Sequence, residues 1–524
     1  MPRPTRFARL LFSLIFVWLL ALPARAETMR LALHAHLYSI DPVITMEYIT
    51  RSHGYLVYDT LFALDENLEP QPQMVSDWSV SEDQLTWSFT LRPGQQWHDG
   101  TPVTAEDCVA SLLRWGARDA QGWLLMSNTS AIRATAPDSF TITLRRPYPR
   151  MLEHLAKSSL NVPFMMPRRI AETGPFQPIT DATGSGPYRF VAAEWVPGEI
   201  AVYEKNETYV PRQDPPSFAA GAKTAHFDRI ELVAYSDPRE ALQALASDEV
   251  QLVETPSMPE LALLPPDSDI KTVVFDPTGN FGTAIFNHQM PPFDNPGIRR
   301  AVLIAMGQTS YLSAAISDRA YWSPCLSIYP CHTTYSHVVS APYYMRGDLQ
   351  LAAKALAEAG YSGAPVVVVD PVDSPVLSGF TRVTVDLLGQ LGMNVVHKPM
   401  SWRELRDAVA QRTGEPSQVW NMFHTWWTAD DLSDPMHILF SGDPRLGWIG
   451  WPDDPELEAL RAQFVLSEDE AARKALALRI QDKIVQNGNF AVLGQFIQPL
   501  ALRSSLGGLQ GPFPLYYQLA PADQ

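Results

Sequence analysis

Residues 97–107 read WHDGTPVTAED, and this stretch decides how the surrounding chain is organised. It follows residues 85–91 (LTWSFTL), whose alternating apolar and polar side chains predict a strand. Thr104 and Asp107 stand in front of an apolar helical pattern that continues to Trp115, which predicts a capping box and a helix. The block is therefore interpreted as a turn between a strand and a capped helix, without catalytic chemistry.

Outward from this block, strands and helices alternate along the chain. Short strands are predicted first, at residues 140–144, 188–192, 200–204 and 230–234. Later elements comprise a helix starting at Asp237-Pro238, strands at 366–369, 395–396 and 419–423, a helix at 380–391, and helix caps at 401–404 and 467–470. This later order predicts a parallel α/β unit. With 524 residues, we expect two or three domains.

The first 26 residues have the pattern of an export signal. Arg3, Arg6 and Arg9 precede an apolar run at residues 10–22, and Ala24-Arg25-Ala26 offers small residues to a signal peptidase. The run is shorter than the roughly 20 residues of a spanning helix, which disfavours the alternative of a retained anchor. No cysteine lies near the cleavage point, so we do not expect a lipid anchor. We expect a soluble protein in the periplasm.

The acidic charge excludes one class of partner. The formal net charge is −17, and removal of the four arginines in residues 1–26 makes it −21. Such a surface repels phosphate backbones, and the sequence shows no basic stripe, so we expect no nucleic-acid partner.

The three cysteines predict one disulfide and no zinc site. Cys325 and Cys331 flank a short loop, and an oxidising compartment favours bonding them, although two free thiols are the alternative. Closing so short a loop would contribute only about 2 kcal/mol. Cys108 lies in the helical pattern and is expected to be a buried, unpaired thiol.

The sequence contains no complete catalytic motif. HExxH, GxSxG, Walker and GxGxxG patterns are missing, and residues 268–271 (SDIK) match SxxK without the partner motifs of that class. The histidines do not fall at metal-ligand spacing. His34 and His36 share one face of a probable strand, and we interpret them as an ordinary pair. No catalytic residue, metal or cofactor is predicted.

Aromatic side chains gather next to acidic ones late in the chain. Residues 426–431 read WWTADD, and Trp402, Trp448 and Trp451 lie nearby in sequence. Aromatic walls with one fixed charge are typical of pockets for small polar or cationic ligands, although tryptophans also fill cores. Because neighbouring residues on a strand point to opposite faces, at most one of Trp426 and Trp427 needs to face a ligand.

These features together resemble a known family. The matching segments lie at 41–42, 58–62, 68–70, 97–107, 184–188, 227–230, 293–301, 355–361 and 452–456. The chain is similar over essentially its whole mature length to the dipeptide- and oligopeptide-type periplasmic solute-binding proteins (solute-binding family 5) of ABC importers. The 97–107 block is the most diagnostic of these segments.

The resemblance implies an α/β fold of the class II periplasmic binding protein type, with two lobes around a ligand cleft and an additional inserted domain. Domain I would be discontinuous, at residues 27–60, 187–278 and 495–524. Domain II would be inserted at 61–186, and domain III would cover 279–494.

The resemblance also implies ligand-binding residues. In peptide-binding members an aspartate just after a Trp-containing strand end holds the ligand's ammonium, and Asp430 occupies that place. Trp427, Trp426 and Trp402 are expected to wall the same pocket. Dipeptide-binding members use an arginine near the preceding strand, but here that region carries Asp370 and Asp373, and Arg382 lies in a helical stretch. The two aspartates predict a cationic or neutral ligand in preference to a free carboxylate.

The resemblance implies a monomeric, non-enzymatic receptor that captures a peptide or another amine-bearing solute and delivers it to an inner-membrane ABC permease. A non-peptide ligand such as an opine, glycoside or other metabolite is the alternative within this class. A secreted hydrolase, and a sensor or adhesin that reuses the fold, are alternatives from other classes.

The export signal makes a direct prediction. Cleavage after Ala26 should leave Glu27 at the amino terminus, because the Ala24-Arg25-Ala26 ending follows an apolar run too short to span a bilayer. N-terminal sequencing of the protein recovered from the periplasm checks this. A membrane-bound form that retains Met1 would contradict it.

Overall fold

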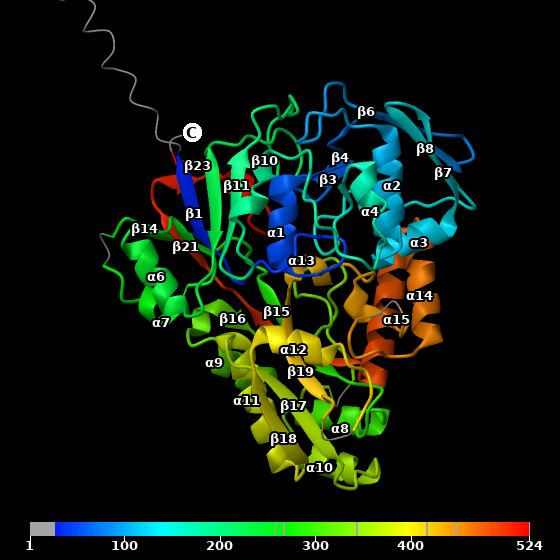
Figure 1. Cartoon of the computed structure of the whole chain (residues 1–524). Coiled ribbons are helices and arrows are strands. Elements are labelled where there is room, and N and C mark those ends of the chain that lie inside the picture. Colours follow the sequence, from blue (N-terminus) through cyan, green and yellow to red (C-terminus); the bar gives the residue numbers. More distant parts are fainter. Residues whose placement is uncertain are drawn as a thin grey trace, which may run out of the picture.

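The computed structural model describes residues 27–256, 258–265, 268–341, 344–415, 418–445 and 448–522. The predicted signal sequence and its cleavage site lie outside these residues. Three larger sheets organise the chain (Figure 1), with seven, six and four strands. We call the part built on the seven-stranded sheet and helix α1 (Tyr48–Val57) the first lobe, and the part built on the six-stranded sheet the second lobe.

The seven-stranded sheet draws on distant parts of the chain. Its order is β10 (Tyr188–Phe190), β11 (Ile200–Lys205), β12 (Arg229–Val233), β1 (Thr28–Ala32), β13 (Leu252–Val253), β21 (Leu500–Arg503) and β14 (Ile270–Val273). β1 lies parallel to both β12 and β13 at the centre, and the outer pairs are antiparallel. Central strands with apolar residues such as Leu31 and Ile230 bury both faces, as parallel strands require.

The six-stranded sheet has a parallel half and an antiparallel half. Its order is β16 (Trp322–Ser323), β20 (Phe490–Phe496), β15 (Asn280–Phe286), β19 (Met422–Thr428), β17 (Pro365–Pro371) and β18 (Asn394–Met400). The valine run of β17 is fully buried, and this strand lies parallel to β18 and β19. The predicted parallel α/β unit is present here, with helix α11 (Pro375–Gln390) connecting β17 to β18.

The 97–107 block joins the four-stranded sheet to the first lobe. The sheet order is β5 (Val75–Val80), β6 (Thr86–Leu91), β8 (Ser139–Leu144) and β7 (Thr129–Ala136), and α2 (Ala105–Gly116) follows the block. The predicted capping box is confirmed, because Thr104 and Asp107 exchange side-chain and backbone hydrogen bonds. Asp107 also accepts from the Trp97 indole (3.2 Å), and the His98 N–H donates to the Gly184 carbonyl (2.8 Å). The block is thus structural.

The remaining helices and short strands complete the layers. Further helices are α3 (Ala120–Asn128), α4 (Met151–Leu155), α5 (Arg168–Ala171), α6 (Pro238–Ala246), α7 (Met258–Leu261), α8 (Pro296–Ala305), α9 (Gln308–Ala315), α10 (Leu349–Glu358), α12 (Trp402–Val409), α13 (Ala429–Leu432), α14 (Pro455–Leu466) and α15 (Glu470–Asn487). Two-stranded pairs join β2 (Asp59–Thr60) with β9 (Phe164–Met165), β3 (Phe62–Leu64) with β4 (Pro70–Pro72), and β22 (Leu506–Gly507) with β23 (Ala520–Pro521).

The chain passes between the lobes at two adjacent crossovers. The first joins β14 to β15, and the second joins β20 to β21. The two crossovers lie side by side because β14 pairs directly with β21 in the first lobe and β15 pairs directly with β20 in the second. The limits of the three predicted domains remain a prediction.

Four sequence predictions of local structure are corrected. The predicted strand at 419–423 is β19 (Met422–Thr428), because aromatic and β-branched residues extend the strand to Thr428. The helix predicted at 380–391 begins at Pro375, where proline suits the first turn. The cap predicted at Ser467 lies at Asp469, whose side chain accepts the Ala472 N–H, whereas Ser467 ends the preceding helix. The strand predicted at 188–192 ends at Phe190 and gives way to a 3₁₀ turn.

The cysteines have clear positions. Cys325 and Cys331 are bonded to each other, with Cα atoms 5.9 Å apart. Cys108 is free and buried in α2, and burial raises the pKa of its thiol well above the ordinary value. A thiol in this state is inert towards oxidation and metals at neutral pH.

A buried ion pair ties the amino-terminal segment to α2. Arg114 donates to both carboxylate oxygens of Asp41 (3.0 and 2.7 Å), and the side chains are 1% and 0% exposed. Asp41 also accepts the backbone N–H groups of Val43 and Ile179, each at 3.0 Å. The carboxylate is therefore satisfied only while Arg114 is present.

We predict that Arg114→Met lowers the free energy of unfolding by about 3–5 kcal/mol, because it leaves a buried carboxylate without its counter-ion. Urea unfolding measures the loss. Arg168→Met is the matched control, since Arg168 pairs with Glu106 at the surface and should cost about 1 kcal/mol or less. Similar losses for the two variants would show that burial of the Asp41 pair is not decisive.

Candidate functional site

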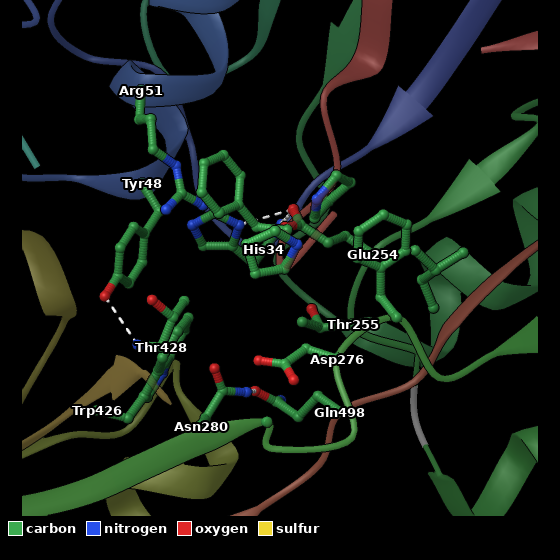
Figure 2. Close-up of a pocket in the computed structure, with 16 residues that line it drawn as sticks. His34, Tyr48, Arg51, Glu254, Thr255, Asp276, Asn280, Trp426, Thr428 and Gln498 are labelled. Atoms are coloured by element: carbon green, nitrogen blue, oxygen red, sulfur yellow. Dashed lines mark hydrogen bonds and ion pairs between the residues drawn. The ribbon is translucent and has the colours of Figure 1, made fainter. Parts of the chain in front are cut away.

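A cavity of about 80 Å³ lies between the two lobes, beside the crossovers. The first lobe contributes Arg51, Tyr48, His34 and Glu254, the second contributes Asn280, Trp426 and Thr428, and the crossovers contribute Asp276 and Gln498. Figure 2 shows Arg51 entering from α1, opposite Asp276, Asn280 and Gln498. Each lobe therefore supplies only part of the wall.

Arg51 is a buried cation held by aromatic rings. Its guanidinium carbon lies 3.6 Å from the ring centroid of Phe513 and 4.5 Å from that of Tyr48, distances at which ring faces attract a cation. Nη1 donates to the Ser159 hydroxyl (2.6 Å), whereas Nε is buried without a partner. Arg51 is 7% exposed. The cavity thus contains a positive charge that the rings position firmly.

The acidic residues of the cavity differ in how far they are already engaged. Glu254 accepts from the backbone N–H of His34 (3.1 Å) and lies 2.7 Å from His34 Nδ1. Burial raises the pKa of Glu254, but His34 outweighs that effect and holds the pKa below its usual value. Asp276 accepts from the backbone N–H and hydroxyl of Thr278, and burial nevertheless raises its pKa. Asp276 is the less strongly stabilised carboxylate.

Tyr48 connects the cavity to the start of α13. Its hydroxyl donates to Asp431 Oδ2 (2.5 Å) and accepts the Thr428 N–H (2.9 Å), and the Thr428 hydroxyl donates to the same Asp431 oxygen (2.8 Å). The Tyr48 ring stacks on Trp426, with centroids 5.3 Å apart. This contact joins the lobes and forms one aromatic wall of the cavity.

Comparison with known proteins identifies this architecture. Residues 69–444 match the bacterial extracellular solute-binding proteins, family 5. The chain belongs to this family. It is 33% identical over 506 residues to a probable peptide ABC transporter periplasmic-binding protein, y4tO, of Sinorhizobium fredii, covering 95% of this chain and 94% of that protein. The predicted family and the role of solute-binding protein of an ABC transporter are confirmed.

Solved structures share the fold. The periplasmic binding protein AgaA of A. tumefaciens R10, in complex with agropinic acid, superposes with a TM-score of 0.77 at 20% identity, over 94% of this chain and 96% of that one. DppA of Helicobacter pylori, in complex with the peptide STSA, gives 0.80 at 19% identity, over 95% and 98%. The predicted two-lobed α/β fold is therefore confirmed.

The structure separates the predicted site residues of this family 5 protein. Trp426 lines the cavity, whereas Trp427 lies on the opposite face of β19, buried against His437 and Trp448 with centroids 4.8 Å from each. Alternation along the strand explains why only one of the two tryptophans faces the cavity.

Asp430 lies next to the cavity without lining it. It is the second residue of α13 and partly exposed, and its charge interacts with Arg51, Asp276 and Asp431. Burial, and then the neighbouring Asp431 carboxylate, raise the pKa of Asp430 to about 7. Near neutral pH this carboxyl carries only part of a negative charge.

The other predicted residues have structural partners outside this cavity. Asp370 accepts a hydrogen bond from the His397 ring (2.8 Å), and Asp373 accepts the backbone N–H of Trp402 (2.8 Å) at the start of α12. Neither carboxylate is among the residues that line this cavity, and their influence on the charge of the ligand remains a prediction. His34 and His36 also have separate partners, Glu254 and the Gly198 carbonyl.

Sequence reasoning did not single out Arg51, Glu254, Asp276, Asn280 or Gln498. Arg51 lies in a helix whose every residue is buried, so no amphipathic pattern marks it. Glu254, Asp276 and Gln498 follow strand ends and Asn280 begins β15, but only the tertiary fold brings these residues together. Within the described residues no group of three or more His, Cys, Asp or Glu could hold a metal, and no helix is long and apolar enough to cross a membrane.

The raised pKa of Asp430 makes stability depend on pH. The folded protein holds the proton more tightly than the unfolded chain, in which Asp titrates at about 3.9, so this carboxyl lowers stability as the pH rises from about 4 to about 7. We predict that Asp430→Asn stabilises the ligand-free protein by about 1–3 kcal/mol at about pH 8 and much less at about pH 4. Chemical unfolding at both pH values measures the difference.

Asp386→Asn, an exposed aspartate of α11, is the matched control and should change stability little at either pH. An equal effect of Asp430→Asn at both pH values would contradict the assignment.

Proposed function

We propose that this solute-binding protein captures a small solute in the cavity between its lobes, that the lobes close around the solute, and that the closed form delivers it to an inner-membrane ABC permease. The observation that carries the proposal is the composition of the cavity wall. Its charged, aromatic and amide groups come from both lobes and from both crossovers. A ligand there would contact both lobes and both crossovers at once. Because these contacts form together only when the lobes are closed, binding of the ligand would favour the closed form.

The proposed ligand is a peptide or another small solute with an amine. Asp276 and Asp430 support this class, because carboxylates beside aromatic walls bind ammonium groups. The relative y4tO is named a probable peptide-binding protein, and the Helicobacter DppA structure holds a peptide. A non-peptide metabolite is the second candidate, favoured by the agropinic acid in AgaA.

We further propose that the protein is a monomeric, periplasmic receptor without catalytic activity. The family is extracellular, and its relatives carry the names of binding proteins. The Cys325–Cys331 bond is consistent with an oxidising compartment.

A thermal-shift screen of peptides, opines and glycosides tests the proposed function. A ligand at 100 times its dissociation constant should add about 2.7 kcal/mol to stability. A stabilising ligand should also change the tryptophan fluorescence intensity of the wild type. Trp426→Phe should lose this change, because Trp426 faces the cavity. Turnover of any stabilising compound would instead support the hydrolase alternative.

For a ligand with an ammonium group, we predict that Asp430→Asn weakens binding about 30-fold or more at about pH 8, since removing one partner of a buried charge pair costs about 2 kcal/mol or more. Isothermal titration calorimetry measures the affinity. Asp386→Asn should leave the affinity unchanged. Unchanged affinity in Asp430→Asn would leave Asp430 without a role as ammonium anchor.

A further inference from the structure

Arg51 differs from two other deeply buried cations, Arg114 and Lys223. Arg114 is paired with Asp41, and Lys223 is paired with Asp59 at 2.5 Å. In the part of the chain that the structure describes, no carboxylate forms an ion pair with Arg51, whose one hydrogen bond goes to the neutral Ser159 hydroxyl. A guanidinium has five N–H donors, so most of its capacity is unused.

The nearby acids do not supply the missing partner. Glu254 is engaged by His34, and Asp431 by Tyr48 and Thr428. Asp430 acts on Arg51 through space without an ion pair. A buried charge that lacks a hydrogen-bonded counter-ion is costly, and it persists where a ligand completes it.

We propose that the guanidinium of Arg51 binds a carboxylate of the transported solute, so that the first lobe, through α1, anchors the anionic end of the ligand. This inference rests on the proposed function of the cavity. Arg51 lines the cavity, is oriented by Phe513 and Tyr48, and is nine-tenths buried with an unpartnered Nε. A planar fork of donors of this kind matches a carboxylate with two parallel hydrogen bonds.

The charge of the cavity selects a carboxylate over a phosphate. Arg51 is accompanied by Glu254 and Asp276 in the wall, so a phosphate carrying about two negative charges would meet more repulsion than attraction. A single carboxylate adds one negative charge directly opposite the guanidinium. The ligand class is therefore a small carboxylic acid.

The residues on the opposite wall of the cavity indicate which other functional groups this acid carries. Asp276, Asn280 and Gln498 face Arg51 across the cavity and offer oxygen acceptors, with Trp426 beside them. These groups suit hydroxyl or ammonium donors on a compact body that lies against the indole. The proposed ligand is thus an acid that also carries donors, which differs from the cationic or neutral ligand predicted from Asp370 and Asp373.

The experiment measures binding to the full mature chain by native mass spectrometry and calorimetry. Protein is purified from the periplasm of cells grown on peptone, and any bound compound is identified. The peptide STSA and agropinic acid serve as defined probes, each as the free acid and as its amide. Arg51→Gln removes the charge, whereas Arg51→Lys keeps the charge but not the planar pair of N–H donors. Arg382→Gln is the matched control, because Arg382 is an exposed arginine of α11.

The expected result is a bound compound with a free carboxylate, or a probe bound as acid and at least about 30-fold more weakly as amide. Arg51→Gln should lose at least the same factor, Arg51→Lys should lie between it and the wild type, and Arg382→Gln should equal the wild type. Circular dichroism establishes folding, and Arg51→Lys carries the test if Arg51→Gln does not fold.

Equal binding of acid and amide, undiminished binding by Arg51→Gln, or a bound compound whose anionic group is a phosphate would overturn the inference while leaving the receptor function intact. Absence of any bound compound and of any probe binding in the folded wild type would overturn the proposed function itself, and this inference with it.

Discussion

The pairing of the two crossovers is the constraint on which the lobes and the cavity depend. β14 pairs with β21 in one lobe and β15 with β20 in the other, so the connecting segments run side by side. Gln495 donates to the Thr278 carbonyl (2.9 Å), which fixes the two segments to each other. Gly279 adopts a φ of +65°, and a Cβ there would lie 2.4 Å from the Phe496 carbonyl oxygen, so this close approach requires glycine. The crossovers thereby place Asp276, Asn280 and Gln498 together.

Burial of charge separates structure from function in this protein. Arg114 and Lys223 each contact a carboxylate within the first lobe, and such pairs are strongly destabilised when one partner is removed. They hold the fold in one arrangement. Arg51 is buried to a similar degree but contacts rings and a hydroxyl, so its electrostatic requirement is not met within the described chain. The requirement that a buried charge has a partner thus gives Arg114 and Lys223 a role in the fold and Arg51 a role in the cavity.

Sequence signals of short range predicted much of the fold. The capping boxes at Thr104 and Ser401 involve residues three positions apart, and the valine run of β17 marks a buried strand by composition alone. Strand alternation also predicted that Trp426 and Trp427 would not both face the cavity. These features succeed because the interactions that cause them lie within one element.

The cavity required information that no local pattern contains. Arg51 and Phe513 meet although they lie near opposite ends of the part of the chain that the structure describes, and Glu254 and His34 meet through the seven-stranded sheet. The resemblance predicted Asp430, Asp370 and Asp373 as ligand contacts, but none of the three lines the cavity. The hydrogen bonds of Asp370 and Asp373 to His397 and Trp402 form across β18 and α12, which sequence spacing does not reveal.

Contacts between the lobes and the charge of Arg51 act in opposite directions on the proposed closure. Tyr48 with Asp431 and Arg406 with Glu47 (2.5 Å) join the lobes directly, and Arg150 with Asp434 (2.8 Å) joins the segment after the four-stranded sheet to the second lobe. The two ion pairs are only partly buried, so each contributes of order 1 kcal/mol. Closing an empty cavity, however, removes water from a guanidinium without a counter-ion, which costs more than such a pair supplies. A carboxylate ligand offsets that cost only in the closed form, and this difference in affinity between forms is what allows a ligand to shift the population.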